Sequence, residues 1–165
     1  MNTLVKLLFI GSPVYGTAVA TNFFSKKKAA LNKALELVEN KGIINIGSGC
    51  SRSALAGYIC NLESVRVNVD ISNGSAKMLC VDLELGSLPF EDKEFDVAYA
   101  SHVLEHLKNW QGALDEWCRI ADYVIVVLPH PLSIGGRLNP DHWQHFSFRD
   151  MDYIRLHWPT VELFA

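Results

Sequence analysis

The sequence lacks the charge excess that is typical of nucleic-acid-binding proteins. Its 165 residues carry 15 lysines and arginines against 18 aspartates and glutamates, which gives a formal net charge of −3 at pH 7. Because a positive surface is what draws a protein to a phosphate backbone, we expect no nucleic-acid partner.

Closely spaced cysteine pairs are absent as well. No two of the four cysteines form a Cys-x-x-Cys motif, so a zinc site built from them is not expected. We interpret all four as small buried hydrophobic residues in a reducing compartment, and we expect a protein of the cytoplasm or of the cytoplasmic face of a membrane. They are Cys50, Cys60, Cys80 and Cys118.

Charge is also missing from the amino-terminal part, where residues 7–24 hold no charged side chain and are followed by Lys26–Lys28. A run of this length reaches the lower limit of a membrane span, and the lysines would then lie on the cytoplasmic side. Pro13 and two glycines interrupt the run, so a segment packed on the domain or on a partner protein is an equal alternative, and a targeting segment is a third. The lysines themselves are interpreted as a solvated helix start, with lipid headgroups as the alternative contact. We divide the chain into an apolar segment, 1–24, that is a membrane anchor or interface, and a domain, 25–165.

The remaining residues alternate between strand and helix patterns, without internal repeats, and their number suits one domain with a single core. Only 11 residues separate Asp70 from Asp82, too few for a full crossover helix, so we expect a turn around Asn73 and Gly74 instead. Strands are expected at 42–46, 65–69, 78–83, 95–100 and 123–128, with room for a sixth at 161–165, and helices at 25–40, 53–60, 109–121 and 148–158.

The most informative stretch is residues 43–53, in which a buried strand runs into the turn Gly47-Ser48-Gly49 and then into a helix. Glycines leave backbone N–H groups accessible at the carboxyl end of the strand, which is where nucleotide-like ligands bind in open α/β sheets. Two later strands end near acidic residues, Asp70 and Asp82, at ordered distances from this turn.

Three further motifs follow in order: Leu88–Phe90, the strand Phe95–Ala100, and the segment Ser101–Leu107 with its sequence Ser-His-Val-Leu-Glu-His-Leu. Together with the glycine turn and the acidic strand ends, they resemble class I S-adenosylmethionine-dependent methyltransferases of the type 11-like branch over residues 42–131. The resemblance implies an α/β fold: a Rossmann-like, doubly wound sheet of five parallel strands with room for a sixth, truncated at the carboxyl terminus. Because the family usually adds an antiparallel seventh strand, an edge is left exposed or is covered by the amino-terminal segment or another chain.

The resemblance also implies S-adenosylmethionine as cofactor and assigns its contacts. The glycine turn would approach the methionine part, Asn45 stands where the family usually has an acidic residue, and Ser51 stands where a third glycine is frequent. Asp70 would accept hydrogen bonds from the ribose and Asp82 from the adenine amino group, although a turn-forming Asp70 and a solvated Asp82 are the alternatives. The expected cofactor contacts are Asn45, Gly47, Gly49, Asp70, Ile71, Asp82, Leu83 and Ser101.

His102 and His106 are the candidate catalytic residues, because in the family the loop after the fourth strand faces the transferring methyl group. A histidine near its free pKa can serve as general base for a hydroxyl or acid substrate. The alternative is a structural hydrogen bond that fixes the loop, since methyl displacement from a sulfonium depends mainly on alignment. An Asn-Pro-Pro-Tyr motif is absent after this strand, which argues against DNA adenine methylation.

Three more histidines, His130, His142 and His145, follow the fifth strand. His142 and His145 lie near Asp141 at a spacing that metal ligands use, but no glutamate or cysteine accompanies them at a telling distance, so we expect no metal. Their region resembles the lid over the acceptor pocket in sugar- and lipid-modifying relatives.

We therefore expect methyl transfer from S-adenosylmethionine to a small, lipid- or sugar-linked acceptor, at oxygen. The alternative is a methyltransferase-like structural or interaction subunit of a larger assembly with little or no catalysis. The short carboxyl terminus, Asn45, Ser51 and the apolar amino terminus favour the alternative, whereas Asp70, Asp82 and the histidine segment favour the enzyme.

Overall fold

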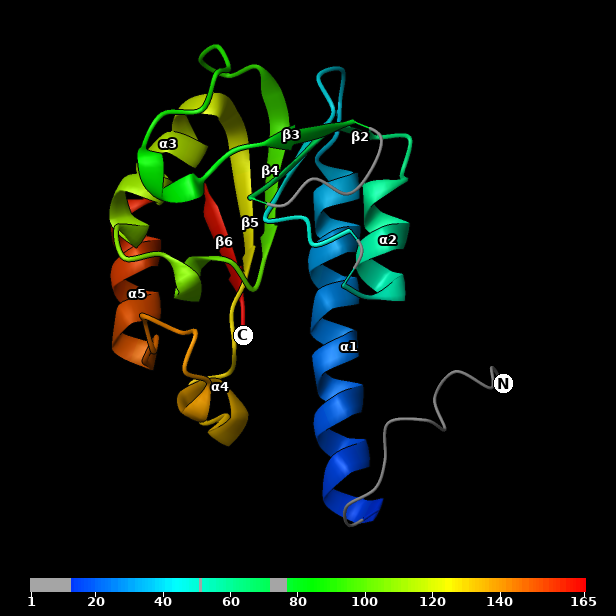
Figure 1. Ribbon diagram of the computed structural model, residues 1–165, viewed down its shortest axis with the longest axis vertical. Coiled ribbons are helices and arrows are strands. Elements are labelled where there is room, and N and C mark those ends of the chain that lie inside the picture. The colour runs from blue at the N-terminus through cyan, green and yellow to red at the C-terminus, as the bar shows by residue number, and fades with distance from the viewer. Residues whose placement is uncertain (1–12, 51, 72–76) are drawn as a thin grey trace.

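The computed structural model describes residues 13–50, 52–71 and 77–165, which form one parallel sheet between two layers of helices (Figure 1). The strands are β1 (Ile43–Ile46), β2 (Val65–Asp70), β3 (Met78–Cys80), β4 (Phe95–Ser101), β5 (Ala121–Val127) and β6 (Val161–Phe164). The helices are α1 (Pro13–Glu36), α2 (Ala54–Cys60), α3 (Trp110–Ile120), α4 (Ile134–Leu138) and α5 (Phe148–His157), with short 3-10 turns η2 (Leu83–Leu85) and η3 (Leu104–His106).

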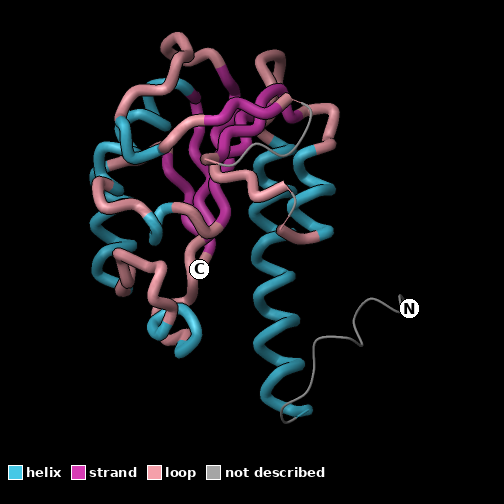
Figure 2. Tube along the Cα trace, in the orientation of Figure 1, coloured by secondary structure: helices cyan, strands magenta, loops and turns pink. Residues whose placement is uncertain are grey.

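The sheet has the strand order β3-β2-β1-β4-β5-β6, and every neighbouring pair is parallel (Figure 2). Strands β1, β4 and β5 are mostly apolar and almost wholly buried because both faces of the sheet are covered. The chain leaves β1 in one direction and returns on its other side as β4, so the order reverses between these two strands. Ligands of doubly wound sheets bind at the carboxyl ends of such a pair. The predicted fold class and the sixth strand are confirmed.

The two faces of the sheet carry separate hydrophobic cores. Helices α1 and α2 cover one face, and α3 and α5 cover the other (Figure 1). Ala30, Leu31 and Ala34 of α1 pack with Ile43 and other residues of the first face, at helical spacing. Trp117 and Leu114 of α3 are buried in the larger core on the second face.

Helix α1 is longer at its start and shorter at its end than the helix predicted over 25–40. It begins at Pro13, so the division that we drew between residues 24 and 25 falls inside a continuous helix. Its first half extends past the carboxyl edge of the sheet (Figure 1). No helix within the described residues is long and apolar enough to cross a membrane. The turn expected at 73–74, like residues 1–12, lies outside the described residues.

The third strand is shorter than predicted, and ends at Cys80 where 78–83 was expected. Asp82 caps the 3-10 turn η2, and its side chain accepts a hydrogen bond from the Glu84 N–H at 3.0 Å. This local side-chain bond competes with extension of the strand.

The prediction of four free cysteines is wrong for one pair. Cys50, in the turn after β1, forms a disulfide with Cys60 at the end of α2, while Cys80 and Cys118 are free. The expectation that all four are buried is also wrong for Cys80, which is exposed. The spacing of ten residues carried no recognisable pairing signal, because the short helix α2 is what returns Cys60 to the glycine turn. The expectation of a reducing compartment rested on free cysteines and stays untested.

Candidate functional site

The glycine turn after β1 is shaped by the histidine segment that follows β4. Gly47 and Gly49 have φ angles of 59° and 50°, a region that side chains disfavour. A Cβ atom on Gly47 would lie 2.3 Å from Val103 Cγ2, so the close approach of this valine also requires glycine.

Asp70 holds the same turn from the neighbouring strand. Its carboxylate, with only 5% of the residue exposed, ends β2 and accepts a hydrogen bond from the Gly49 N–H at 2.7 Å. The Ser48 N–H donates to the Val69 carbonyl at 3.0 Å beside it. The predicted meeting of Gly47, Gly49 and Asp70 at one edge of the sheet is therefore what the structure shows.

Asn45 has a structural bond that the sequence did not reveal. Its side-chain amide donates to Asn68 Oδ1 at 2.9 Å, and the Asn68 amide donates in turn to the Cys60 carbonyl at 3.1 Å. This buried pair joins β1, β2 and the end of α2. An acidic residue in place of Asn45 would have no N–H group to donate to Asn68 Oδ1.

A small cavity opens beside the glycine turn, between α1, α2 and β4. Among the residues that line it are Lys27, Asn45, Gly47, Tyr99 and Ser101. The Tyr99 hydroxyl and Ser101 Oγ are buried beside one another, and neither has a further hydrogen-bond partner among the described residues. Burial raises the pKa of Tyr99 to about 12, so its hydroxyl stays protonated as a donor near neutral pH. Buried hydroxyls with so few partners are costly, so a polar ligand in this cavity would be stabilised by them.

Lys27 and Tyr99 were missed as site residues. The lysines at 26–28 were interpreted as solvated, yet Lys27 is part of the cavity lining, where burial lowers its pKa and the Glu105 charge opposes that effect. A signal was present, because Lys27 precedes buried Leu31 and Ala34 by four and seven residues and so lies on the same helix face. Tyr99 likewise precedes Ser101 by two residues and shares its side of the strand.

The expected adenine contacts are less closely assembled. Ile71 is 64% exposed just after β2, where an apolar side chain can cover one face of a ring. One carboxylate oxygen of Asp82 already accepts the hydrogen bond that caps η2, and Leu83 is half-buried against the larger core. Asp82 and Leu83 follow β3 at the same edge of the sheet as Asp70. The N–H of the preceding residue, Val81, donates a hydrogen bond of 2.9 Å to the Asp70 carbonyl.

The two candidate catalytic histidines have different partners. His102 has a φ of 57°, and its Nδ1 lies 3.0 Å from Oε1 of Glu105. Because a carboxylate only accepts, this ring nitrogen carries the hydrogen and Nε2 is the basic one. His106 Nδ1 lies 2.9 Å from the Asp141 carbonyl and donates to it. Both histidines thus make the fixing hydrogen bonds that we considered as the alternative.

A second cavity lies on the other side of Glu105. The histidines predicted to cover an acceptor are all in its lining, which apart from Glu105 comes from the segment between β5 and α5. His145 is fixed by a 3.0 Å contact between its Nε2 and the Arg137 carbonyl, and His130 Nδ1 accepts from the Leu132 N–H at 3.2 Å. The lining includes Glu105, His130, Ser133, Arg137, His142 and His145.

Comparison with known proteins points to the family that the motifs indicated. Residues 44–122, just under half of the chain, match the family model of the methyltransferase domain. This part of the chain is therefore similar to methyltransferase domains. The match agrees with S-adenosylmethionine as the cofactor that the motifs predict. A search of curated proteins finds no match to the chain.

Solved methyltransferases share the fold. An S-adenosylmethionine-dependent methyltransferase of Archaeoglobus fulgidus is 19% identical, with a TM-score of 0.61, and the match covers 87% of this chain and 73% of that one. A possible histamine N-methyltransferase of Thermotoga maritima is 22% identical over 86% of this chain and 76% of its own, with a TM-score of 0.55. The YcgJ protein of Bacillus subtilis is 18% identical over 79% and 66%, with a TM-score of 0.58. At these identities the likeness is one of fold alone.

The methyltransferase site fits its cofactor on the observations above. The glycine turn exposes backbone donors, and Asp70 offers a carboxylate at the adjacent strand end. Within the described part of the chain, the Tyr99 and Ser101 hydroxyls have no partner beyond each other. Lys27 adds a cation that suits a carboxylate group of the ligand.

Proposed function

We propose that this methyltransferase modifies a hydroxyl group of a lipid- or sugar-linked acceptor that enters the cavity beside Glu105. The observation that carries the proposal is that one short segment contributes to both cavities. Ser101 lines the cavity by the glycine turn, and Glu105, four residues later, lines the cavity under the histidines. A cofactor in the first and an acceptor in the second would meet across this segment.

The residues have the following roles in the proposal. Asp70 binds the ribose, Ile71 covers the adenine, and Lys27 pairs with the methionine carboxylate. The bound cofactor supplies the methyl group from its sulfonium. His102 is the general base, because Glu105 Oε1 holds its Nδ1–H and leaves Nε2 to accept the proton of the acceptor hydroxyl.

Two features of the surface around the acceptor cavity favour an apolar acceptor chain. Leu132, Ile134 and Leu138, on and next to α4, are 68%, 74% and 77% exposed. The first half of α1, whose sequence from Pro13 to Phe24 is uncharged, extends past the same edge of the sheet (Figure 1). The exposed leucines and isoleucine on and next to α4 mark an interaction site for apolar groups.

The alternative, a methyltransferase-like interaction subunit, is supported by one observation. The polar side chains of Asn45 and Asp82, two of the expected cofactor contacts, are engaged in structural hydrogen bonds.

The test combines cofactor binding with methyl transfer. Calorimetric titration of the full chain with S-adenosylmethionine should show one binding site. Incubation with methyl-labelled cofactor and a lipid extract should move the label into the lipid fraction, with heat-treated protein as the control. Cofactor binding without methyl transfer to any lipid or sugar fraction would favour the alternative function, an interaction subunit. Absence of binding would reject S-adenosylmethionine both as a bound cofactor and as a methyl donor.

A further inference from the structure

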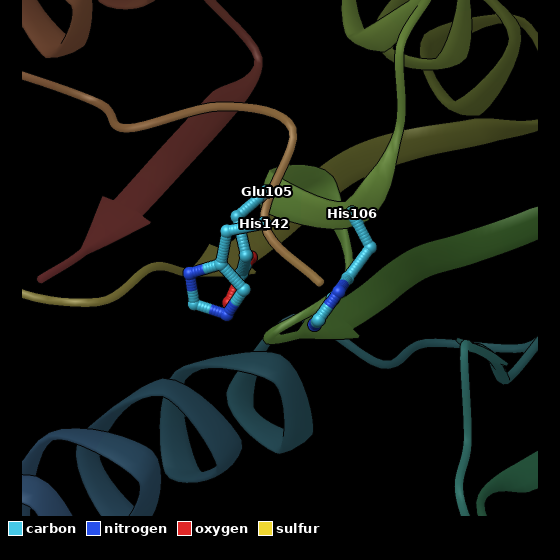
Figure 3. A group of neighbouring side chains, drawn as sticks. All are labelled: Glu105, His106 and His142. Atoms are coloured by element: carbon cyan, nitrogen blue, oxygen red, sulfur yellow. The ribbon is translucent and has the colours of Figure 1, made fainter. Parts of the chain in front are cut away.

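Three side chains that can ligate a metal converge beside the acceptor cavity (Figure 3). Glu105 and His106 belong to η3, and His142 comes from the loop between α4 and α5. One ligand atom from each side chain lies within 4.8 Å of the others. The two imidazole rings are nearly perpendicular, with centroids 4.7 Å apart.

The Glu105 carboxylate has an oxygen that no part of the described chain satisfies. The residue is 1% exposed, and Oε1 contacts His102 Nδ1, but Oε2 is buried without a hydrogen-bond partner. A buried carboxylate oxygen left in this state is costly, and a cation relieves that cost directly. This orphaned oxygen is the observation, beyond clustering, that points to a ligand.

The hydrogen bonds of His106 prepare it as a ligand. Its Nδ1–H donates to the Asp141 carbonyl at 2.9 Å, which fixes the tautomer and leaves the lone pair on Nε2. A carbonyl behind one ring nitrogen is the usual support of a metal-binding histidine.

His142 is held by the same loop. Asn139 Oδ1 accepts from the Asp141 N–H at 3.0 Å, so its amide nitrogen is the donor to His142 Nε2 at 2.9 Å. The ring is therefore neutral, as a metal ligand must be, and a cation at Nε2 would replace only a neutral amide bond.

We propose that Glu105, His106 and His142 bind a divalent transition-metal ion of the zinc class. Two imidazoles and one carboxylate suit zinc and its neighbours, whereas magnesium and calcium prefer oxygen ligands alone. Three protein ligands would leave coordination positions open, as in catalytic sites, and two of the three, Glu105 and His142, line the acceptor cavity. The expectation of no metal considered only the pair His142 and His145, because the approach of η3 was not visible in the sequence. This site does not depend on the proposed function.

Zinc binding to the full chain, freed of metal by chelation and dialysis, tests the proposal by calorimetry and by thermal unfolding. The parent protein should bind one zinc ion, and binding by His106→Ala and His142→Ala should be weaker by at least about 10-fold. Zinc should therefore raise the unfolding temperature of the parent and of the control variant more than that of these two variants. Glu105→Gln should weaken binding while keeping the shape of the side chain. His157→Ala, on the exposed side of α5, is the matched control and should bind zinc like the parent. Because it keeps the free thiols of Cys80 and Cys118, it also controls for zinc bound to them.

Three outcomes would overturn the site. They are a parent that binds no zinc, a His142→Ala variant that binds as tightly as the parent, or a loss in His145→Ala without a loss in His106→Ala. The unfolding temperatures of the metal-free variants separate loss of the site from loss of the fold. His142→Ala is the decisive variant, because its half-buried side chain lies on a loop. Titration with S-adenosylmethionine on the same metal-free samples keeps this result separate from the proposed function.

Discussion

At the residue scale, the site depends on a few side chains with two duties. Asp70 closes the glycine turn through the Gly49 N–H and is also the predicted ribose acceptor. Glu105 orients His102 and also faces the acceptor cavity. Such residues are constrained twice, so their substitution should change both local order and binding.

Asp70→Ala should weaken S-adenosylmethionine binding by about 1.5–3 kcal/mol, the scale for loss of a charged hydrogen-bond partner. Calorimetric titration measures the effect, and Asp152→Ala, an exposed aspartate on α5, is the control. An unchanged affinity in Asp70→Ala would show that this residue only shapes the turn.

His102→Asn should lower methyl-transfer turnover by roughly 10²–10⁴-fold while cofactor affinity is kept, because it removes a general base. Asparagine is the chosen replacement, since it tolerates the positive φ of 57° at this position. Steady-state rates at saturating cofactor give the measurement, with His157→Asn as the control. A loss of only a few-fold would leave alignment as the whole mechanism.

At the scale of elements, two anchors fix the strands that carry the site. The disulfide between Cys50 and Cys60 ties the turn after β1 to the end of α2. On the far side of β1, the buried carboxylate of Asp96 accepts backbone hydrogen bonds at 2.8–3.0 Å from Glu39, Lys41 and Gly42. These bonds join the segment that enters β1 to the start of β4.

Replacing both Cys50 and Cys60 by serine should lower the free energy of unfolding by about 2–3 kcal/mol, the loop-closure value for a short loop. Denaturant unfolding in the absence of reductant measures it, with Cys80→Ser, an exposed free thiol, as the control. Equal stability of the parent under oxidising and reducing conditions would argue against the bond.

Asp96→Asn should cost about 1.5–3 kcal/mol of stability near neutral pH. Burial opposes ionisation of this carboxyl, but the three backbone N–H groups and Lys41 outweigh it and lower its pKa. Its contribution is therefore complete above the unfolded pKa of about 3.9 and is lost as pH falls toward the lower folded value. Denaturant unfolding at several pH values should show the parent and the variant converging in acid; a gap that persists at low pH would contradict this.

At the scale of the whole molecule, the carboxyl edge of the sheet is the functional end. Both cavities lie there, and the first half of α1 extends past it (Figures 1 and 2). We propose that this extension, together with residues 1–12, attaches the domain to a membrane or a partner protein near the acceptor.

Deletion of residues 1–20 should release the protein from vesicles or from its complex, because it removes most of the uncharged run. The remaining part of α1 still includes Lys27 and its buried apolar face, so cofactor binding should persist. Sedimentation with vesicles of anionic lipid and size-exclusion chromatography measure attachment. A full-length chain that stays a monomer in the absence of detergent, with residues 1–20 open to protease, would reject both attachments.

The sequence by itself determined the order of elements and the composition of the cofactor edge. The apolar runs of β1, β4 and β5 and the Gly47-x-Gly49 turn are local signals, and parallel strands bring their carboxyl ends to one edge. Only the tertiary structure decided which side chains take part in interactions other than those predicted from the sequence. Asn45 bonds to Asn68, Cys60 returns to Cys50 and Lys27 lines the cavity because each meets a partner from another element, whose approach no local pattern encodes. For the same reason His142 reaches Glu105 only in the folded chain, where a long-range contact replaces a sequence spacing.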